Sequence, residues 1–314
     1  MQDLTKPPKP PAPGQQQPGQ QQYQQPGQQQ YQQPYQQPGQ QQYQQPNQQY
    51  QYQQPNQQQY QYQQSGQYQQ AGYQSFEQTE LLAQEQERVF FQKIYFWMCG
   101  ALVVTGLTGY FLSKSYAWFH FLTYSKITIF LILGVQIGLV IAINALMNKV
   151  SSAVIKVLFG AFAISMGFTT SIVLLAYPSG AIAKAFFTTA IVYAAMAIFG
   201  LVTKKSLKAW GAFLFMGLIG LIAASVINLF LHSPAMDYVI CWVGVIVFAG
   251  LTAYDHQKLR VLFASNFQDS YNYPAGSETI YTEQQANLVT YGALTLYLDF
   301  INLFLFLVRL FGRE

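Results

Sequence analysis

Residues 287–311 read NLVTYGALTLYLDFINLFLFLVRLF, a run of 25 residues with only two charged side chains, Asp299 and Arg309. A helix needs about 20 apolar residues to cross a bilayer core about 30 Å thick. The run is long enough to do so, and it lacks the period-two alternation of a strand in a membrane β-barrel. It therefore predicts a membrane-spanning helix.

Six further apolar runs precede this one. We place them at about 94–113, 127–147, 153–176, 182–202, 209–231 and 237–258. Polar or helix-breaking segments separate the runs at 114–126, 148–152, 178–180, 203–208 and 232–234. The sequence therefore predicts an all-α integral membrane protein, a bundle of seven transmembrane helices.

The beginning of the chain has a different composition. Charged residues make up 9% of the chain, against about 25% in soluble domains, and none lies between Pro10 and Phe76. This Gln-, Tyr- and Pro-rich region cannot bury enough apolar surface to offset the entropy of ordering it. We expect residues 1–75 to form a disordered cytoplasmic tail, 76–93 an amphipathic lead-in and 94–314 the membrane domain. The tail is either a solvated tether or an interaction arm.

Lys and Arg residues are distributed unequally between the two sets of loops. The side of the N-terminus carries 11 of the 16, and the other side carries 5, which are Lys114, Lys126, Lys184, Arg309 and Arg313. Because cytoplasmic loops carry the excess of positive charge, the N-terminus is expected to be cytoplasmic. If the last run were re-entrant, the C-terminus would also be inside and the split would become 13 to 3.

Two acidic residues are predicted to lie within the bundle, Asp255 and Asp299. A charged side chain at the bilayer centre costs about 2.5–3.5 kcal/mol, so an acid retained there indicates a function. Other polar or small residues share a helix face with each aspartate and are expected to line a pore. They are Gly292, Thr295 and Asn302 for Asp299, and Thr252 for Asp255.

The two carboxylates form a proton-operated latch if they approach one another, because a pair in a medium of low dielectric shares a proton. The alternative for each is a helix-packing hydrogen bond or, for Asp255, a solvated helix end. From the predicted spans, Asp299 lies roughly 18 Å along its helix, whereas Asp255 lies near a cytoplasmic end. They meet only if the last helix begins in the cytoplasm, or if the sixth is tilted or unwound.

Four motifs are spread over residues 91–312. They are Phe91-Gln-Lys-Ile-Tyr-Phe-Trp-Met98, Thr203-Lys-Lys-Ser-Leu207, Gly250-Leu-Thr-Ala-Tyr-Asp255, and Gly292-Ala-Leu-Thr-Leu-Tyr-Leu-Asp-Phe-Ile-Asn-Leu-Phe304 followed by Arg309-Leu-Phe-Gly312. Together they resemble the transmembrane Bax inhibitor motif family, and most closely its bacterial branch. The last motif is long and specific, and the others are individually modest.

The resemblance implies a pH-sensitive calcium leak in which Asp255 and Asp299 act as the sensor and offer calcium a transient site. It also implies a basic residue near the cytoplasmic end of the second helix, for which Lys149 is the nearest match; Lys149 is equally expected as a positive-inside anchor. His256 stands where the family usually has Thr. We expect it to be solvated, the alternative being that it shifts the switch.

Other functions are weighed against the leak. One alternative is a non-transporting regulator of stress or proteolysis that binds a membrane protease or another partner protein. An intramembrane aspartyl protease has little support, because Leu296-Tyr-Leu298 precedes Asp299 in place of the Gly-x-Gly of such enzymes, so no enzyme is predicted.

Calcium is expected as a transported ion, and no cofactor is expected. The lipid bilayer is the expected environment, and nucleic acid is not expected as a partner. Cys99 and Cys241 are expected to be core residues, without a disulfide or a metal. The absence of a cleavable signal favours a bacterial cytoplasmic membrane over the endoplasmic reticulum or Golgi.

Overall fold

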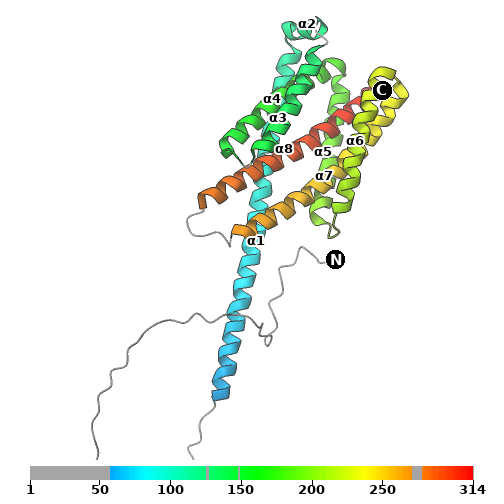
Figure 1. Cartoon of the computed structure of the whole chain (residues 1–314). Coiled ribbons are helices and arrows are strands. Elements are labelled where there is room, and N and C mark those ends of the chain that lie inside the picture. The colour runs from blue at the N-terminus through cyan, green and yellow to red at the C-terminus, as the bar shows by residue number, and fades with distance from the viewer. Residues whose placement is uncertain (1–56, 125–126, 148, 271–277, 314) are drawn as a thin grey trace, which may run out of the picture. The chain divides into compact units, whose positions relative to one another are not determined.

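The computed structural model describes the backbone of residues 57–124, 127–147, 149–270 and 278–313 (Figure 1). Side chains are described for residues 80–122, 124, 127–147, 149–266 and 283–313. Most of the predicted tail, residues 1–56, lies outside the described residues, so its disorder stays a prediction.

The described part of the chain consists of eight helices and contains no strand. They are α1 (Gln57–Ser113), α2 (Tyr116–Tyr124), α3 (Ile127–Leu146), α4 (Ser152–Ala176), α5 (Ser179–Val202), α6 (Lys208–Leu231), α7 (Pro234–Ser270) and α8 (Glu278–Phe311). All except α2 are long and apolar enough to cross a membrane. The predicted bundle of seven helices is therefore confirmed. Each predicted break falls between two candidate spans, and the first of these breaks contains the short helix α2.

Three helices are much longer than the sequence predicts, and two of them, α7 and α8, carry the two aspartates. α7 continues past the predicted end at residue 258 to Ser270, and α8 begins at Glu278 rather than at 287. Hydropathy falls after Tyr254 because five polar residues follow between 255 and 260. Hydrogen bonds or ion pairs within the protein hold the last four of these side chains, and the helix does not end. The predicted boundary at 258 was wrong, and Asp255 lies in the interior of α7.

α1 runs without interruption through residues 75 and 93, where the sequence suggested boundaries between the tail, the lead-in and the membrane domain. Its candidate span begins at Glu80, earlier than the predicted start at 94. The division of the chain into three parts stays a prediction.

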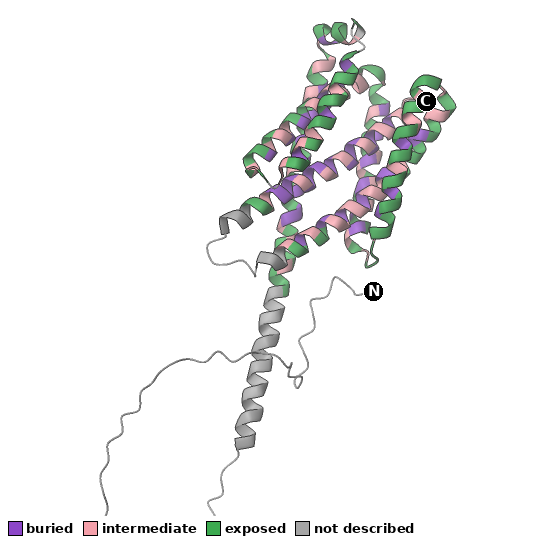
Figure 2. Ribbon diagram, in the orientation of Figure 1, coloured by how far each residue is buried: buried purple, intermediate pink, exposed green. Residues whose placement is uncertain are grey.

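α8 is the central helix of the bundle. In its most apolar window 61% of the residues are buried, against 11–39% for the other six candidate spans. It packs against α4, α5 and α7, while α6 packs on α7 and α3 on α4. Buried residues accordingly follow α8 in Figure 2, whereas α3 and α6 present mostly exposed apolar side chains. Such outer surfaces suit contact with lipid.

A buried hydrogen-bond pair joins α1 to this centre. Thr105 Oγ1 donates to the Ala163 carbonyl of α4 (2.8 Å) and therefore accepts from the Tyr297 hydroxyl of α8 (2.7 Å). Tyr297 is fully buried, with Phe159 and Phe162 edge-on to its ring. The pair thus links three helices at one level and satisfies two hydroxyl groups that would otherwise be costly to bury.

α5 and α7 approach each other closely at Gly200. A Cβ atom at this position would lie 2.3 Å from the carbonyl oxygen of Ala253, so only glycine fits without a shift of the backbone. Small residues at such crossings let two membrane helices pack backbone against backbone. Because Ala253 lies two residues before Asp255, this crossing fixes the part of α7 that carries the aspartate.

Candidate functional site

α7 and α8 run antiparallel, and their contacts show which residues lie level with one another. Lys258 Nζ donates to the Tyr291 hydroxyl (3.2 Å) and lies 5.8 Å from the centroid of that ring. Asp255 precedes Lys258 by about one turn of α7, so it lies level with Thr295 of α8. Asp299 follows Thr295 by about one further turn of α8 (~6 Å). The difference in depth expected from the sequence is thus reduced to about one helical turn, because both helices extend beyond their predicted spans.

The aspartate cluster combines two acids and one base. Asp299 is 4% exposed, and its Oδ2 is buried without a hydrogen-bond donor among the described residues. Asp255 is half-buried. Its carboxylate interacts electrostatically with that of Asp299, and Lys258 interacts with both. With all three groups ionised, the cluster therefore carries one net negative charge.

The four predicted pore-lining residues, Thr252, Gly292, Thr295 and Asn302, differ in their contacts and burial. Thr252 and Asn302 each donate a hydrogen bond of 2.8 Å to the carbonyl group four residues earlier in their own helix. Thr295 is half-buried. At Gly292 a Cβ atom would lie 2.6 Å from Ile94 Cδ1, so this glycine admits α1 to the surface of α8. Gly292 is thus a packing position, and the role of all four in lining a pore stays a prediction.

Lys149 is exposed in the turn between α3 and α4. Asn287 Nδ2 donates to the carbonyl groups of Met147 (2.7 Å) and Val150 (3.3 Å), which holds this turn against the early part of α8. Asn287 precedes Asp299 by about 18 Å of helix. The structure therefore does not bring Lys149 to the aspartates.

Lys258 is the base that lies at the aspartate pair. From hydropathy, Lys258 was expected among the loop residues on the N-terminal side, because the sixth span was expected to end there. The signal that identifies it is its spacing of three residues from Asp255, which places both side chains on one face of a helix.

His256 is fully buried, so the expectation that it is solvated was wrong. Its Nδ1 lies 2.6 Å from the Thr252 carbonyl oxygen and its Nε2 lies 3.1 Å from the Tyr95 hydroxyl. Because a carbonyl group only accepts, Nδ1 carries the hydrogen, and a neutral ring accepts from Tyr95 at Nε2. The ring also stacks on Phe91 and contacts Tyr193 edge-on. His256 therefore joins α7 to α1, and an influence on the switch stays a prediction.

The positions of the two cysteines and of the possible metal ligands limit how tightly a metal ion could be bound. Cys241 is buried as predicted, but Cys99 is exposed on α1, so its expected core position was wrong. Among the described residues, no group of three or more His, Cys, Asp or Glu side chains could hold a metal ion. Ca²⁺ takes about six to eight oxygen ligands in tight sites, so a cation at two carboxylates would be held weakly.

The sequence model of the family described as "Inhibitor of apoptosis-promoting Bax1" matches residues 87–314, which include the whole aspartate cluster. The chain is 37% identical over 230 residues to the inner membrane protein YbhL of Escherichia coli K12, covering 72% of this chain and 92% of YbhL. It is 34% identical over 237 residues to an uncharacterized protein of Deinococcus radiodurans, with 76% and 96% covered. An uncharacterized protein of Borreliella burgdorferi is 32% identical over 238 residues, with 74% and 97% covered.

Proposed function

The chain belongs to the family of inhibitors of apoptosis-promoting Bax1, as an integral membrane protein with seven apolar helices, and on this premise we propose that it is a passive, pH-sensitive calcium leak. The observation that carries the proposal is Asp299, whose buried Oδ2 has no donor among the described residues and whose carboxylate interacts with that of Asp255. A buried carboxylate oxygen in this state is suited to take a proton or a cation.

Proton and cation compete for the same oxygens. When a proton is shared between the carboxylates, the cluster with Lys258 is neutral; when it leaves, one negative charge remains in a medium of low dielectric. A hard cation such as Ca²⁺ prefers carboxylate oxygen ligands, and a weak site favours passage over retention. By linkage, calcium binding to the pair is expected to weaken as the pH falls, because protons then occupy the carboxylates.

The proposal places the chain in a bacterial cytoplasmic membrane with a cytoplasmic N-terminus. The name of the Escherichia coli relative as an inner membrane protein supports the membrane, and the excess of Lys and Arg in the loops on the N-terminal side supports the orientation. Calcium is the transported ion, and no cofactor or catalysed reaction is assigned. The sequence contains no phosphate-binding Walker A loop, which accords with passive movement.

Calcium flux through proteoliposomes, measured between about pH 5 and 8, tests the proposal. A single proton-linked step changes a population by up to about tenfold per pH unit, so we expect a large pH dependence in the wild type and its loss in Asp299→Asn. Asp237→Asn is the matched control, because it removes an aspartate from the same two-helix pair outside the cluster. Flux that is independent of pH in the wild type, or unchanged in Asp299→Asn, contradicts the proposal.

A further inference from the structure

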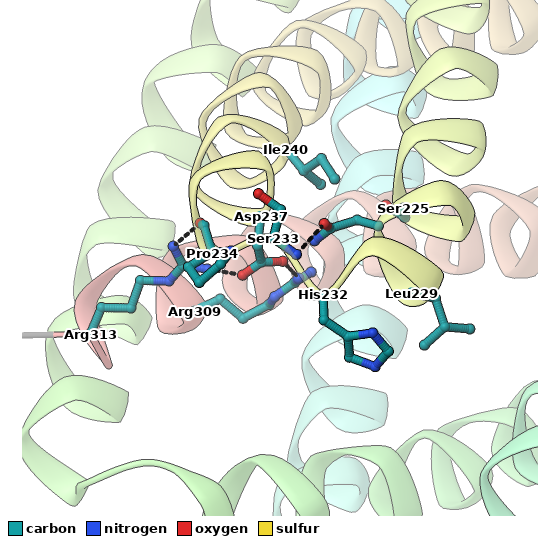
Figure 3. A pocket seen from close by; sticks show the side chains of 10 residues that line it. Ser225, Leu229, His232, Ser233, Pro234, Asp237, Ile240, Arg309 and Arg313 are labelled. Atoms are coloured by element: carbon teal, nitrogen blue, oxygen red, sulfur yellow. Dashed lines mark hydrogen bonds and ion pairs between the residues drawn. The ribbon is translucent and has the colours of Figure 1, made fainter.

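Where α7 begins and α8 ends, three charged side chains border a pocket of about 360 Å³ (Figure 3). Asp237, in the first turn of α7, forms ion pairs with Arg309 and Arg313 from the end of α8. The three side chains are 22%, 36% and 32% exposed. They are therefore accessible from outside the bundle, unlike Asp299.

This cluster carries one more positive charge than negative. Arg313 also donates to the Pro234 carbonyl through Nη1 (3.1 Å). Arg309 donates to Asp237 through Nη2, and its Nε and Nη1 have no acceptor among the described residues. No acidic side chain other than Asp237 lines the pocket within that part of the chain. The guanidinium group of Arg309 therefore has N–H donors left over, at Nε and Nη1. A planar guanidinium group with free donors is suited to bind phosphate oxygens.

The turn between α6 and α7 lines the pocket. His232 ends α6 in the left-handed conformation (φ 49°), and the next N–H, that of Ser233, donates to Asn228 Oδ1 (3.1 Å). α7 begins at Pro234, so the positive end of its helix dipole lies at the pocket, but α6 and α8 both end there and their dipoles contribute the opposite sign. The two guanidinium groups therefore decide which sign of ligand charge the pocket favours.

The surroundings of the pocket are those of a membrane–water interface. Tyr238 and Trp242, in the first turns of α7, are 48% and 49% exposed, and Leu229 on the rim is 57% exposed. Exposed Tyr and Trp side chains concentrate at the level of the lipid headgroups. The pocket therefore opens at the depth where phospholipid phosphates lie.

We propose that this pocket binds a negatively charged phosphate group, with Arg309 as its principal ligand. The volume lies within the range of about 300–1,000 Å³ typical of ligand sites. The side chains of Ser225 and Asn228 supply polar groups beside the arginines. The phosphate belongs either to the headgroup of an anionic phospholipid or to a free phosphate, and its binding does not depend on calcium passage.

The test uses the full chain in a neutral detergent, with binding measured by native mass spectrometry for lipids and by calorimetry for inorganic phosphate. Phosphatidylglycerol is compared with zwitterionic phosphatidylcholine. We expect Arg309→Gln to raise the Kd for phosphatidylglycerol about tenfold, equivalent to about 1.4 kcal/mol. Arg309→Lys keeps the charge without the fork and should lose less. Lys114→Gln, a change of the same kind outside the pocket, should leave the Kd unchanged.

The outcomes separate the two sources. Selective retention of phosphatidylglycerol that depends on Arg309 supports a lipid headgroup, and the same dependence for inorganic phosphate supports a soluble ligand. Equal binding of both lipids with no binding of phosphate overturns the proposal, as does equal binding by the wild type and both Arg309 variants. Arg309→Lys can still pair with Asp237, so the comparison stands even if Arg309→Gln does not fold.

Discussion

The middle and one end of the α7–α8 pair carry charge clusters of opposite composition. Near the centre of the bundle, Asp255 and Asp299 interact with one base among the described residues, Lys258, and one carboxylate oxygen is buried there without a donor. Where α7 begins and α8 ends, Asp237 pairs with both Arg309 and Arg313 beside an open pocket. The same two helices thus have an excess negative charge in the interior and an excess positive charge at the surface.

This difference shows how position decides the use of a charge in a membrane protein. An ion pair at the surface is partly screened and contributes little to stability. An unbalanced charge in the interior is costly and responds strongly to any proton or cation that neutralises it. The interior cluster is therefore suited to sensing and the surface cluster to binding.

The largest effect is expected from Lys258→Met, which leaves two carboxylates without their base. Leaving a buried charge without its opposite charge costs about 3–5 kcal/mol. Because Lys258 is half-buried and acts on the aspartates electrostatically without a direct ion pair among the described contacts, we expect a loss of about 1–3 kcal/mol. Thermal unfolding in detergent measures it. In a double-mutant cycle with Asp255→Asn, the coupling is expected to be about 0.5–3 kcal/mol. If the losses in the free energy of unfolding caused by the two substitutions simply add, Lys258 and Asp255 do not interact.

A smaller effect is expected from Asp237→Asn in the surface cluster. Its ion pairs are partly exposed, so the free energy of unfolding should fall by about 1 kcal/mol or less. The change also removes the acid that competes for the arginines, so binding of phosphatidylglycerol should strengthen. Unfolding and lipid titration are measured on the same preparation. A loss of stability as large as that of Lys258→Met would mean that the two clusters do not differ as described.

The smallest effect on flux is expected from deletion of residues 1–75. The deletion removes none of the seven candidate spans and neither charge cluster, so calcium flux and its pH dependence should be unchanged. Flux in proteoliposomes is the measurement, with the full chain as the control. Lost activity on truncation would instead favour the regulator that uses its tail to bind a protease or another partner.

Hydropathy alone was sufficient to predict the number of spans and the burial of Asp299. The end of the sixth span could not be predicted this way, because the polar residues after Tyr254 are stabilised by partners distant in the chain. Arg260 donates to the Leu201 carbonyl (2.9 Å) and pairs with Glu87 (2.8 Å). A local average of hydropathy cannot include such contacts.

The partners of the aspartates were harder to predict than the aspartates. An acid in an apolar run is visible from sequence because of its cost. The choice of Lys258 over Lys149 depends on where α7 ends, and the burial of His256 depends on Tyr95, 161 residues away. The spacing of three residues between Asp255 and Lys258 is the local pattern that indicates this part of the site, because it places both side chains on one helix face.

The contact of Gly200 with Ala253 has a mechanical consequence. Because the two backbones meet with no room for a side chain at Gly200, we expect a displacement of α7 at this point to move α5 with it. Gln257 extends the coupling outward, because its side chain accepts from the Leu207 N–H (2.7 Å) and donates to the Lys205 carbonyl (2.9 Å). If the aspartate pair takes up a proton as proposed and α7 moves with it, a spectroscopic label on the linker at 203–207 is expected to report on that step from outside the bundle.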